Sequence, residues 1–306
     1  MHRFAASILA IILLVSTASS VLAAPPDSGP SDPAEVEAFL DPIFAKHLAE
    51  YQIPGAVFLL VKDGRILFTK GYGLANVEKG TPVVPDRSLF AIGSVTKLFT
   101  ATAVMQLAEQ GKLDLHADIN QYLKAFQIPA TFPEPITATH LLTHTSGFDE
   151  KVFGMAVRSS ADLEPLGQYL ARELPRRVRP PGQQSQYSNH GMGLAGHLVE
   201  AVSGRSYNQY ISDEILKPLG MNHSTMEMPA ELADDIVPVN GYVGDPPVRQ
   251  PDWFLNIGPA GDLKATATDM AAFMIAHLQN GDYQGKRIFR DETARTMHAL
   301  QFAPPS

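Results

Sequence analysis

The hairpin signal at residues 55–71 constrains the fold of this chain more than any other feature. The apolar runs Gly55–Lys62 and Arg65–Gly71 flank Asp63-Gly64, a dipeptide that strongly favours a two-residue β-turn. Residues 56–61 are continuously apolar, which predicts a strand buried on both faces. A hairpin alone is only marginally stable in water, so other strands or helices must cover it.

Most of the remaining chain is expected to be helical. One helix should start at Ser31 or Asp32, with Pro33 in its first turn, and run to His47 or beyond. Glycine or proline marks the end of several further segments. These predicted helices cover residues 94–110, 119–124, 137–144, 162–174, 190–203, 206–217 and 266–279, with one more at 292–300. Residues 229–252 are proline-rich and should form loops.

Composition excludes several classes of function. At 306 residues and 45% hydrophobic, the chain can bury a large core. Its 24 Lys+Arg against 32 Asp+Glu give a formal charge of −8, which argues against a nucleic-acid partner. The local cluster of Arg172, Arg176, Arg177 and Arg179 is interpreted as a solvated loop. Because the chain has no Cys, disulfides, thiolate nucleophiles and Cys-ligated zinc are excluded.

The N-terminus has the pattern of an export signal. A short positive start, an apolar run to about Val15 and small residues leading to Ala23 predict a signal peptide over residues 1–23. An uncleaved membrane anchor is the alternative, because the segment Phe4–Ala23 is just long enough to span a bilayer. Residues 24–34 are predicted to be a flexible linker and 35–306 a single domain. The mature protein is therefore expected in the periplasm or outside the cell.

Ser94-Val95-Thr96-Lys97 is the first candidate chemical motif. It opens an apolar helical segment, so Ser94 and Lys97 would be neighbours on one face. A serine hydroxyl is a poor nucleophile until a base takes its proton, and a neighbouring lysine can be that base. A plain serine N-cap with a solvated lysine is the alternative interpretation.

Two further motifs lie downstream. Tyr187-Ser188-Asn189 leads into a helix and would place a proton-relaying phenol near an amide-binding carboxamide. His140 and His144 are four residues apart, a spacing that can bind zinc, but Leu141 replaces the Glu of the zinc-protease pattern. We therefore expect structural hydrogen bonds from both histidines and no metal.

Together these motifs carry a resemblance to a known family. Ser94-x-x-Lys97, the Leu141–Gly147 run, Tyr187-x-Asn189 and Pro259-Ala260-Gly261 occur in that order. The sequence resembles the serine β-lactamase and penicillin-binding-protein superfamily, specifically its class C-like branch of D-alanyl-D-alanine carboxypeptidases and esterases. The resemblance implies an α+β fold, in which an antiparallel sheet flanked by helices lies beside a mostly helical lobe.

The resemblance also implies roles for the motif residues. Ser94 would be the acylated nucleophile and Lys97 its activating base. Tyr187 would relay the proton to the leaving group, and Asn189 would contact Lys97 and the substrate amide. Substrates would be small molecules or peptides, such as peptidoglycan-derived peptides, β-lactams or esters. No cofactor and no obligatory protein partner are implied.

One family motif is missing from the sequence. A Lys-Thr-Gly or His-x-Gly strand should follow the helix at 266–279, but neither tripeptide occurs there. In the family this strand supplies one oxyanion donor, whose loss costs about 10²–10³ in rate. The open hairpin edge would also favour aggregation. We therefore expect a chain truncated at its C-terminus.

Two alternatives to a hydrolase remain open. Gly191, Gly193 and Gly196 match a dinucleotide-binding pattern, and Asp213 follows at about the right distance. The polar segment 179–190 cannot be the strand that such a site requires, so close helix packing is the better explanation. The other alternative is a non-catalytic cell-wall or peptide binder, or an inactive fragment of a longer hydrolase.

Overall fold

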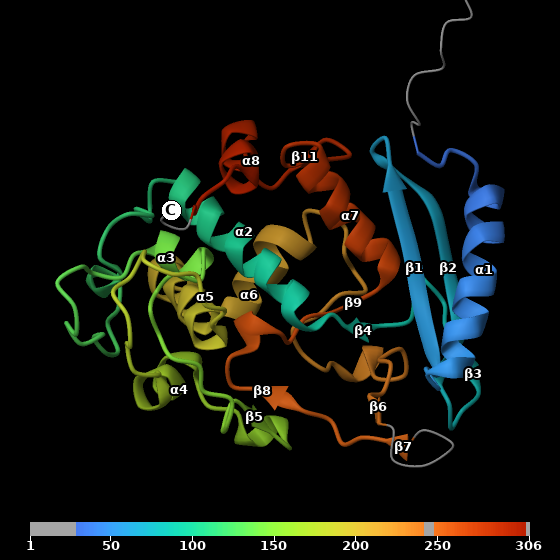
Figure 1. Ribbon diagram of the computed structural model, residues 1–306, viewed down its shortest axis with the longest axis horizontal. Helices are drawn as coiled ribbons and strands as arrows, with labels where there is room; N and C mark the ends of the chain where they lie inside the picture. The colour runs from blue at the N-terminus through green and yellow to red at the C-terminus, as the bar shows by residue number, and fades with distance from the viewer. Residues whose placement is uncertain (1–28, 242–247, 304–306) are drawn as a thin grey trace, which may run out of the picture.

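The β-hairpin and its covering helices form one end of the molecule, and a helical lobe forms the other (Figure 1). The computed structural model describes residues 29–241 and 248–303. Strands β1 (Gly55–Lys62), β2 (Arg65–Asn76) and β3 (Thr81–Pro82) form an antiparallel sheet in the order β1-β2-β3. Helix α1 (Pro33–Glu50) lies on one side of this sheet and α7 (Ala267–Leu278) on the other.

The hairpin turn forms where the sequence predicts it. Lys62 pairs with Arg65, which leaves Asp63 and Gly64 as the two turn residues. Their φ values of 51° and 71° are both positive, as a type I′ turn requires. A register shift between Leu60 and Val61, whose partners are Phe68 and Ile66, leaves Leu67 of β2 as the extra residue of a β-bulge, which increases the local twist.

The prediction that β1 is buried on both faces is only partly confirmed. Each of its residues is only partly buried. The reason is its position, because β1 lies at an edge of the sheet and has β2 as its strand partner within the described residues. The apolar residues 56–61 therefore contact α1 on one face and α7 on the other, and within residues 29–241 and 248–303 no strand other than β2 pairs with β1.

The predicted helices are present, several of them shorter than expected, except that residues 119–124 contain only the 3₁₀ turn Ile119–Gln121. The helical lobe contains α2 (Thr96–Glu109), α3 (Ala138–Leu142), α4 (Leu166–Glu173), α5 (Asn189–Ser203), α6 (Tyr207–Ile211) and α8 (Asp291–His298). Residues 212–216 continue α6 as a π-helix. Short 3₁₀ turns occupy Gly93–Val95, Ile119–Gln121, Ser160–Asp162, Ala230–Leu232 and Gly258–Ala260.

The described residues also form four pairs of two-residue strands, and two of these pairs join segments that are distant in sequence. β4 (Phe90–Ala91) pairs with β9 (Lys264–Ala265), and β5 (Ala156–Val157) pairs with β8 (Phe254–Leu255). β6 (Asn240–Gly241) pairs with β7 (Val248–Arg249), and β10 (Asp282–Tyr283) pairs with β11 (Lys286–Arg287). The β4–β9 pair fixes the segment before α7 beside the start of α2, which is the region of the candidate site.

Helix α2 is the centre of the hydrophobic core. Its Phe99, Val104 and Leu107 are at most 1% exposed, and the helix packs along α5. Phe99 also stacks on Phe273 of α7, with 3.9 Å between the ring centroids. The core thereby connects the hairpin end to the helical lobe.

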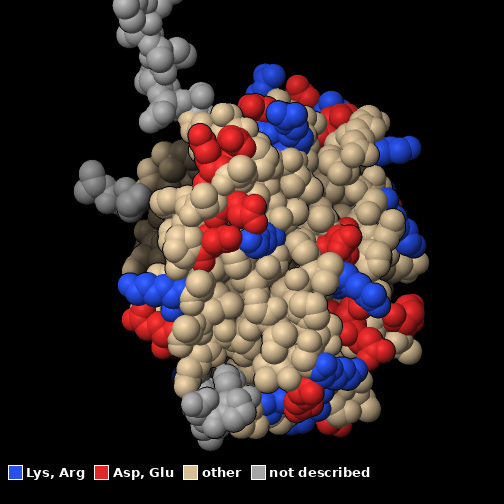
Figure 2. Space-filling model, turned by 90° about the vertical axis from the view of Figure 1, so that its right-hand side faces the viewer, with Lys and Arg blue, Asp and Glu red and all other residues tan. Residues whose placement is uncertain are grey.

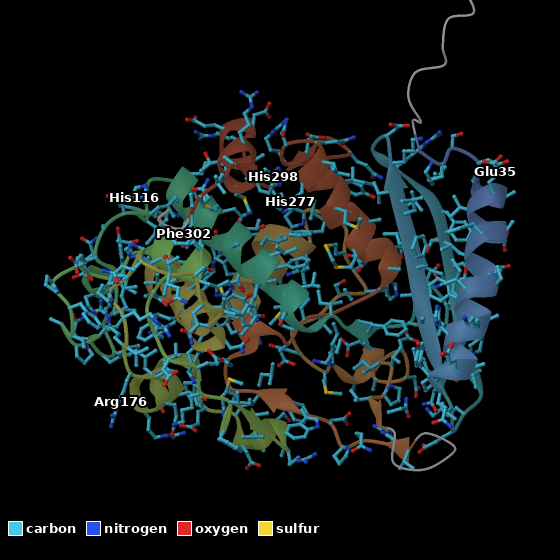
Figure 3. The ribbon with its side chains drawn as sticks, viewed as in Figure 1. Glu35, His116, Arg176, His277, His298 and Phe302 are labelled. Atoms are coloured by element: carbon cyan, nitrogen blue, oxygen red, sulfur yellow. The ribbon has the colours of Figure 1, made fainter. Side chains whose placement is uncertain are left out.

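The arginine cluster is only partly solvated, so its interpretation as a solvated loop is wrong for one member. Arg176 points outward from the lobe (Figure 3). Arg177 is only 9% exposed; it donates to the carbonyl of Glu134 at 3.1 Å and lies over the Phe132 ring. A buried guanidinium needs such partners, and sequence alone does not reveal them.

The face formed by α1 and the hairpin mixes both signs of charge with broad uncharged areas (Figure 2). Lys70 of β2 pairs with Glu37 and Asp41 of α1 at 2.6 and 2.8 Å. Hydrogen bonding to Lys70 lowers the pKa of the Asp41 carboxyl. In the two described stretches of chain, no helix combines the length and apolarity needed to cross a membrane.

Candidate active site

Ser94 lies in the 3₁₀ turn Gly93–Val95, which leads directly into α2. The N-cap of α2 is Val95 and the helix start has no side-chain cap bond, so Ser94 is not the capping serine of the alternative interpretation. Its Oγ lies 3.1 Å from Lys97 Nζ and 2.7 Å from Tyr187 Oη, which donates to it. A hydroxyl held between two groups that can exchange protons is a candidate nucleophile.

Lys97 is buried and fully hydrogen-bonded. Its side chain is 7% exposed, and Nζ donates to Ser94 Oγ, to Asn189 Oδ1 at 2.9 Å and to the carbonyl of Ala260 at 2.6 Å. An ammonium group has three N–H donors, and all of them have an acceptor here. These bonds fix Nζ against Ser94.

Tyr187 and Asn189 reach the site from the start of α5. Ser188 is the N-cap of this helix and its Oγ accepts from the N–H of Gly191, which sets where the two neighbouring side chains project. The Tyr187 ring lies 4.7 Å from Lys97 Nζ and is 49% exposed. All four predicted site residues therefore meet at one place, with the phenol at its open side.

The Ala260 carbonyl belongs to the site, and no side-chain motif pointed to it. The segment from Pro259 to Leu263 is bound to α2 at two positions. Thr100 Oγ1 donates to the carbonyl of Pro259 at 2.7 Å, and the N–H of Leu263 donates to Thr96 Oγ1 at 3.1 Å. The Pro259-Ala260-Gly261 run therefore has a structural role at the site, because two of its carbonyl groups bind side chains of α2.

The two histidines accept hydrogen bonds from the main chain. His140 Nδ1 accepts from Thr137 N–H in a capping box at the start of α3, and His144 Nδ1 accepts from Ser188 N–H. Burial lowers the pKa of His144, and the charge of Lys97 lowers it further. His144 also lies 4.7 Å, centroid to centroid, from the Tyr187 ring, so it supports the turn that carries Tyr187.

The glycines of the dinucleotide-like pattern lie inside α5. A Cβ on Gly193 would meet Ile257 at 3.0 Å, and one on Gly196 would meet Pro259 at 2.2 Å. Close packing of α5 against the Pro259 segment therefore accounts for the two glycines. Asp213 forms an ion pair with Lys217 at 2.7 Å.

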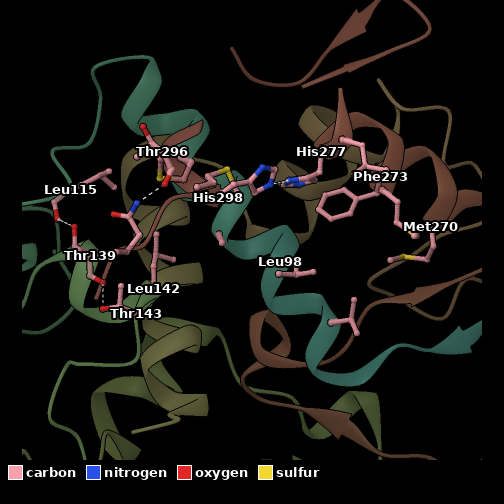
Figure 4. A pocket seen from close by; sticks show the side chains of 17 residues that line it. Leu98, Leu115, Thr139, Leu142, Thr143, Met270, Phe273, His277, Thr296 and His298 are labelled. Atoms are coloured by element: carbon pink, nitrogen blue, oxygen red, sulfur yellow. Dashed lines mark hydrogen bonds between the residues drawn. The ribbon is translucent and has the colours of Figure 1, made fainter. Parts of the chain in front are cut away.

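A cavity of about 600 Å³ lies beside a different face of α2 (Figure 4). It is mostly apolar and runs between α2, α7 and α8, with Leu98, Met270, Phe273 and His298 in its walls. None of the four candidate residues lines it. The candidate active site is the one at Ser94, where a serine hydroxyl lies within hydrogen-bonding distance of an amine and a phenol.

The described chain after α7 holds no counterpart of the third family motif. Its strands are the two-residue pair β10 and β11, joined by a turn and followed by α8. Neither contains Lys-Thr-Gly or His-x-Gly. The oxyanion donor that the family takes from such a strand is therefore not assigned to any described residue.

Comparison with known proteins identifies the family. Residues 40–305 match the family model described as Beta-lactamase, and the chain belongs to this family of serine hydrolases. Protein flp of Staphylococcus aureus (strain MW2) is 29% identical over 79% of this chain and 49% of its own length. Penicillin-binding protein 4 of Amycolatopsis lactamdurans is 31% identical over 76% of this chain and 61% of its own.

Solved structures show the same fold. An octameric penicillin-binding protein homologue from Pyrococcus abyssi matches with a TM-score of 0.73 and 30% identity, over 88% of this chain and 61% of that one. A D-alanine carboxypeptidase from Burkholderia cenocepacia matches with a TM-score of 0.67 and 27% sequence identity. This match covers 87% of this chain and 70% of the carboxypeptidase chain. The α+β prediction is thus confirmed. The chain spans about half the length of flp.

Proposed function

We propose that this chain is a serine hydrolase that forms an acyl-enzyme on Ser94. The position of Ser94 Oγ carries the proposal, because it lies within hydrogen-bonding reach of both Lys97 Nζ and Tyr187 Oη. General acid–base groups must reach the proton they transfer at about such distances. Family membership supports the same chemistry.

The reaction would proceed in two steps. Ser94 Oγ attacks the carbonyl carbon of an amide or ester, and its proton passes to Lys97, which must be a neutral amine to accept it. The leaving nitrogen or oxygen takes a proton as its bond to carbon breaks. Tyr187 is placed to deliver this proton, since its hydroxyl bonds to Ser94 and half of its surface is exposed. Water then attacks the acyl-enzyme: its hydroxyl leaves with the acid, and its proton restores the Ser94 hydroxyl. The proton held by Lys97 returns to Tyr187 through Ser94 Oγ, which bonds to both groups.

The proposed substrates are amides and esters of small size. D-Ala-D-Ala peptides, β-lactams and simple esters fit the chemistry, and relatives named as penicillin-binding proteins and D-alanine carboxypeptidases support this range. Asn189 would bind the substrate amide, because its Nδ2 carries two hydrogens. The loops 148–160 and 229–252 would determine which of these substrates fits.

Hydrolysis of a substrate panel tests the proposal. Wild-type protein should hydrolyse at least one activated ester, D-Ala-D-Ala peptide or penicillin, and Ser94→Ala should lose that activity. Equal hydrolysis by Ser94→Ala would refute the acyl-enzyme on Ser94. Binding without hydrolysis by the wild type would favour the alternative, a non-catalytic peptide or cell-wall binder.

We also propose that the protein is exported, on the basis of the signal-like residues 1–23, which lie outside the described residues. N-terminal sequencing of protein recovered from the periplasm or medium should begin at Ala24. A chain retained in the cytoplasm with its N-terminus intact would contradict the proposal.

A further inference from the structure

Glu150 contacts the site from the side of Asn189 that faces away from Lys97. Its Oε1 accepts from Asn189 Nδ2 at 3.0 Å, and its two oxygens lie 3.4 and 3.2 Å from the backbone N of Asn189. We propose that Glu150 is a positioning residue, which orients the Asn189 amide so that its oxygen holds Lys97 against Ser94. This inference rests on the proposed function of Ser94 and Lys97.

The orientation follows from which groups can donate. The two ends of an Asn side chain have the same shape but opposite hydrogen-bonding character, and a carboxylate only accepts while an ammonium only donates. In the observed orientation the NH₂ group faces Glu150 and the oxygen faces Lys97. A flipped amide would place its oxygen against the carboxylate and its NH₂ group against the ammonium. Glu150 therefore excludes the flipped state.

Helix α5 strengthens this arrangement. Asn189 is the first residue of the helix, so its N–H has no acceptor within the helix. The Glu150 carboxylate accepts from this N–H, at the end of the helix where negative charge is favoured. The hydrogen bonds from Asn189 to Glu150 and from Lys97 to Asn189 form a continuous chain, in which each bond polarises the next.

The segment that carries Glu150 is itself held in place. Phe148 is 1% exposed and forms a β-bridge with Arg177. The N–H of Asp149 donates to the carbonyl of Arg176 at 2.8 Å, and Asp149 Oδ1 accepts from the N–H of Glu150 at 2.9 Å. The buried Phe148 thus fixes the main chain two residues before Glu150.

Rates of Ser94 acylation by a fluorophosphonate, measured on purified variants, test the proposal. Glu150→Leu should slow acylation about 10- to 100-fold, the effect of losing a hydrogen bond within a charged network. Glu150→Gln should stay within about 5-fold of wild type, because its oxygen can still accept from Asn189 Nδ2. Asp162→Leu removes an exposed carboxylate downstream in the same part of the chain and should leave the rate unchanged.

A double-mutant cycle separates positioning from a general effect of charge or folding. If Glu150 acts through Asn189, then adding Glu150→Leu to Asn189→Ala should change the rate less than about 2-fold. The same 10- to 100-fold loss in the Asn189→Ala background would overturn the proposal. A 10- to 100-fold loss in Glu150→Gln would also overturn it, because the charge would then matter and not the orientation.

The side-chain NH₂ resonances of Asn189 give a readout that does not depend on activity. They are assigned by their disappearance in Asn189→Ala, and Glu150→Leu should shift them and accelerate their exchange with solvent. Unchanged resonances in Glu150→Leu would refute the positioning role, even in an active enzyme. If wild type fails to acylate but the resonances respond, the proposed function fails and the positioning of Asn189 stands.

Discussion

Ser94 Oγ has two neighbours that can exchange its proton, and they differ in their surroundings. Lys97 is buried and bonded to three acceptors, whereas Tyr187 is half exposed. The buried amine is placed to accept the serine proton, and the exposed phenol is placed to meet a leaving group in solvent. The contrast in burial therefore assigns different steps to the two residues.

Replacement of Tyr187 by Phe tests this division at the residue scale. The ring and its contact with Lys97 remain, but the hydroxyl that bonds to Ser94 Oγ is lost. We expect turnover of an amide to fall about 10²- to 10⁴-fold, the range of general acid–base catalysis, with little change in KM. Tyr51→Phe is the matched control, because Tyr51 is similarly exposed at 52% and lies in none of the site contacts. A loss confined to KM would contradict the assignment.

The segment Pro259–Leu263 acts as one wall of the site because two helices hold it. Thr100 and Thr96 of α2 bind it through hydrogen bonds, and α5 approaches it closely at Gly196. The Ala260 carbonyl that accepts from Lys97 belongs to this segment. Packing between elements therefore determines the position of a group in the active site.

Replacement of Gly196 by Ala tests the role of this packing. The new Cβ would lie 2.2 Å from Pro259 Cγ and 2.5 Å from its Cβ, so the Pro259 segment must move. Helix propensity favours Ala by about 1 kcal/mol, but overpacking costs about 1–3 kcal/mol. We expect a lower Tm and slower acylation of Ser94. Pro259→Ala removes the nearer atom and should restore part of both, and an unchanged Tm and rate in Gly196→Ala would refute the argument.

The position of β1 at the edge of its sheet predicts self-association of the protein. Among the described residues β1 has β2 as its only strand partner, and a strand at the edge of a sheet favours pairing with another chain. We expect reversible self-association that grows with concentration in sedimentation experiments. Leu59→Lys introduces a charge in mid-strand and should reduce it, whereas a monomer at all concentrations would contradict this account.

At the scale of the whole molecule, buried neutral histidines make stability depend on pH. His190 in α5 is 0% exposed, and burial lowers its pKa to about 4. The unfolded chain, with an ordinary pKa of 6.5, takes up this proton first as the pH falls. The stabilising contribution is therefore complete above pH 6.5 and is lost as the pH falls towards 4. It amounts to about 3 kcal/mol at most.

Urea unfolding at pH 7.5 and pH 4.5 checks this prediction. The free energy of unfolding of the wild-type protein should be lower at pH 4.5 than at pH 7.5. The difference between these two free energies should be smaller in His190→Gln. Burial raises the pKa of Asp262 and Asp269, which acts in the opposite direction. Comparison of wild type with His190→Gln isolates the contribution of His190 to the pH dependence. An identical pH dependence of stability in both proteins would contradict the role assigned to His190.

Local signals predicted the elements and the site side chains, but not the groups that support the site. Asp63-Gly64 predicted its turn because φ preferences are local, and Ser94 and Lys97 were found because i, i+3 spacing implies contact on a helix. The Ala260 carbonyl could not be predicted, since a backbone group carries no sequence signal. Glu150 was missed and Arg177 was wrongly interpreted as solvated, because their partners are distant in sequence and only tertiary packing brings them together.

The central claim is that Ser94 is an activated nucleophile, and the mass of the intact protein tests it most directly. Protein lacking residues 1–23 is exposed to a fluorophosphonate or a penicillin, alongside Ser94→Ala. The account predicts a single adduct on the wild type and none on the variant. A wild-type protein that is folded by circular dichroism yet gains no adduct, or an equal adduct on Ser94→Ala, would contradict it.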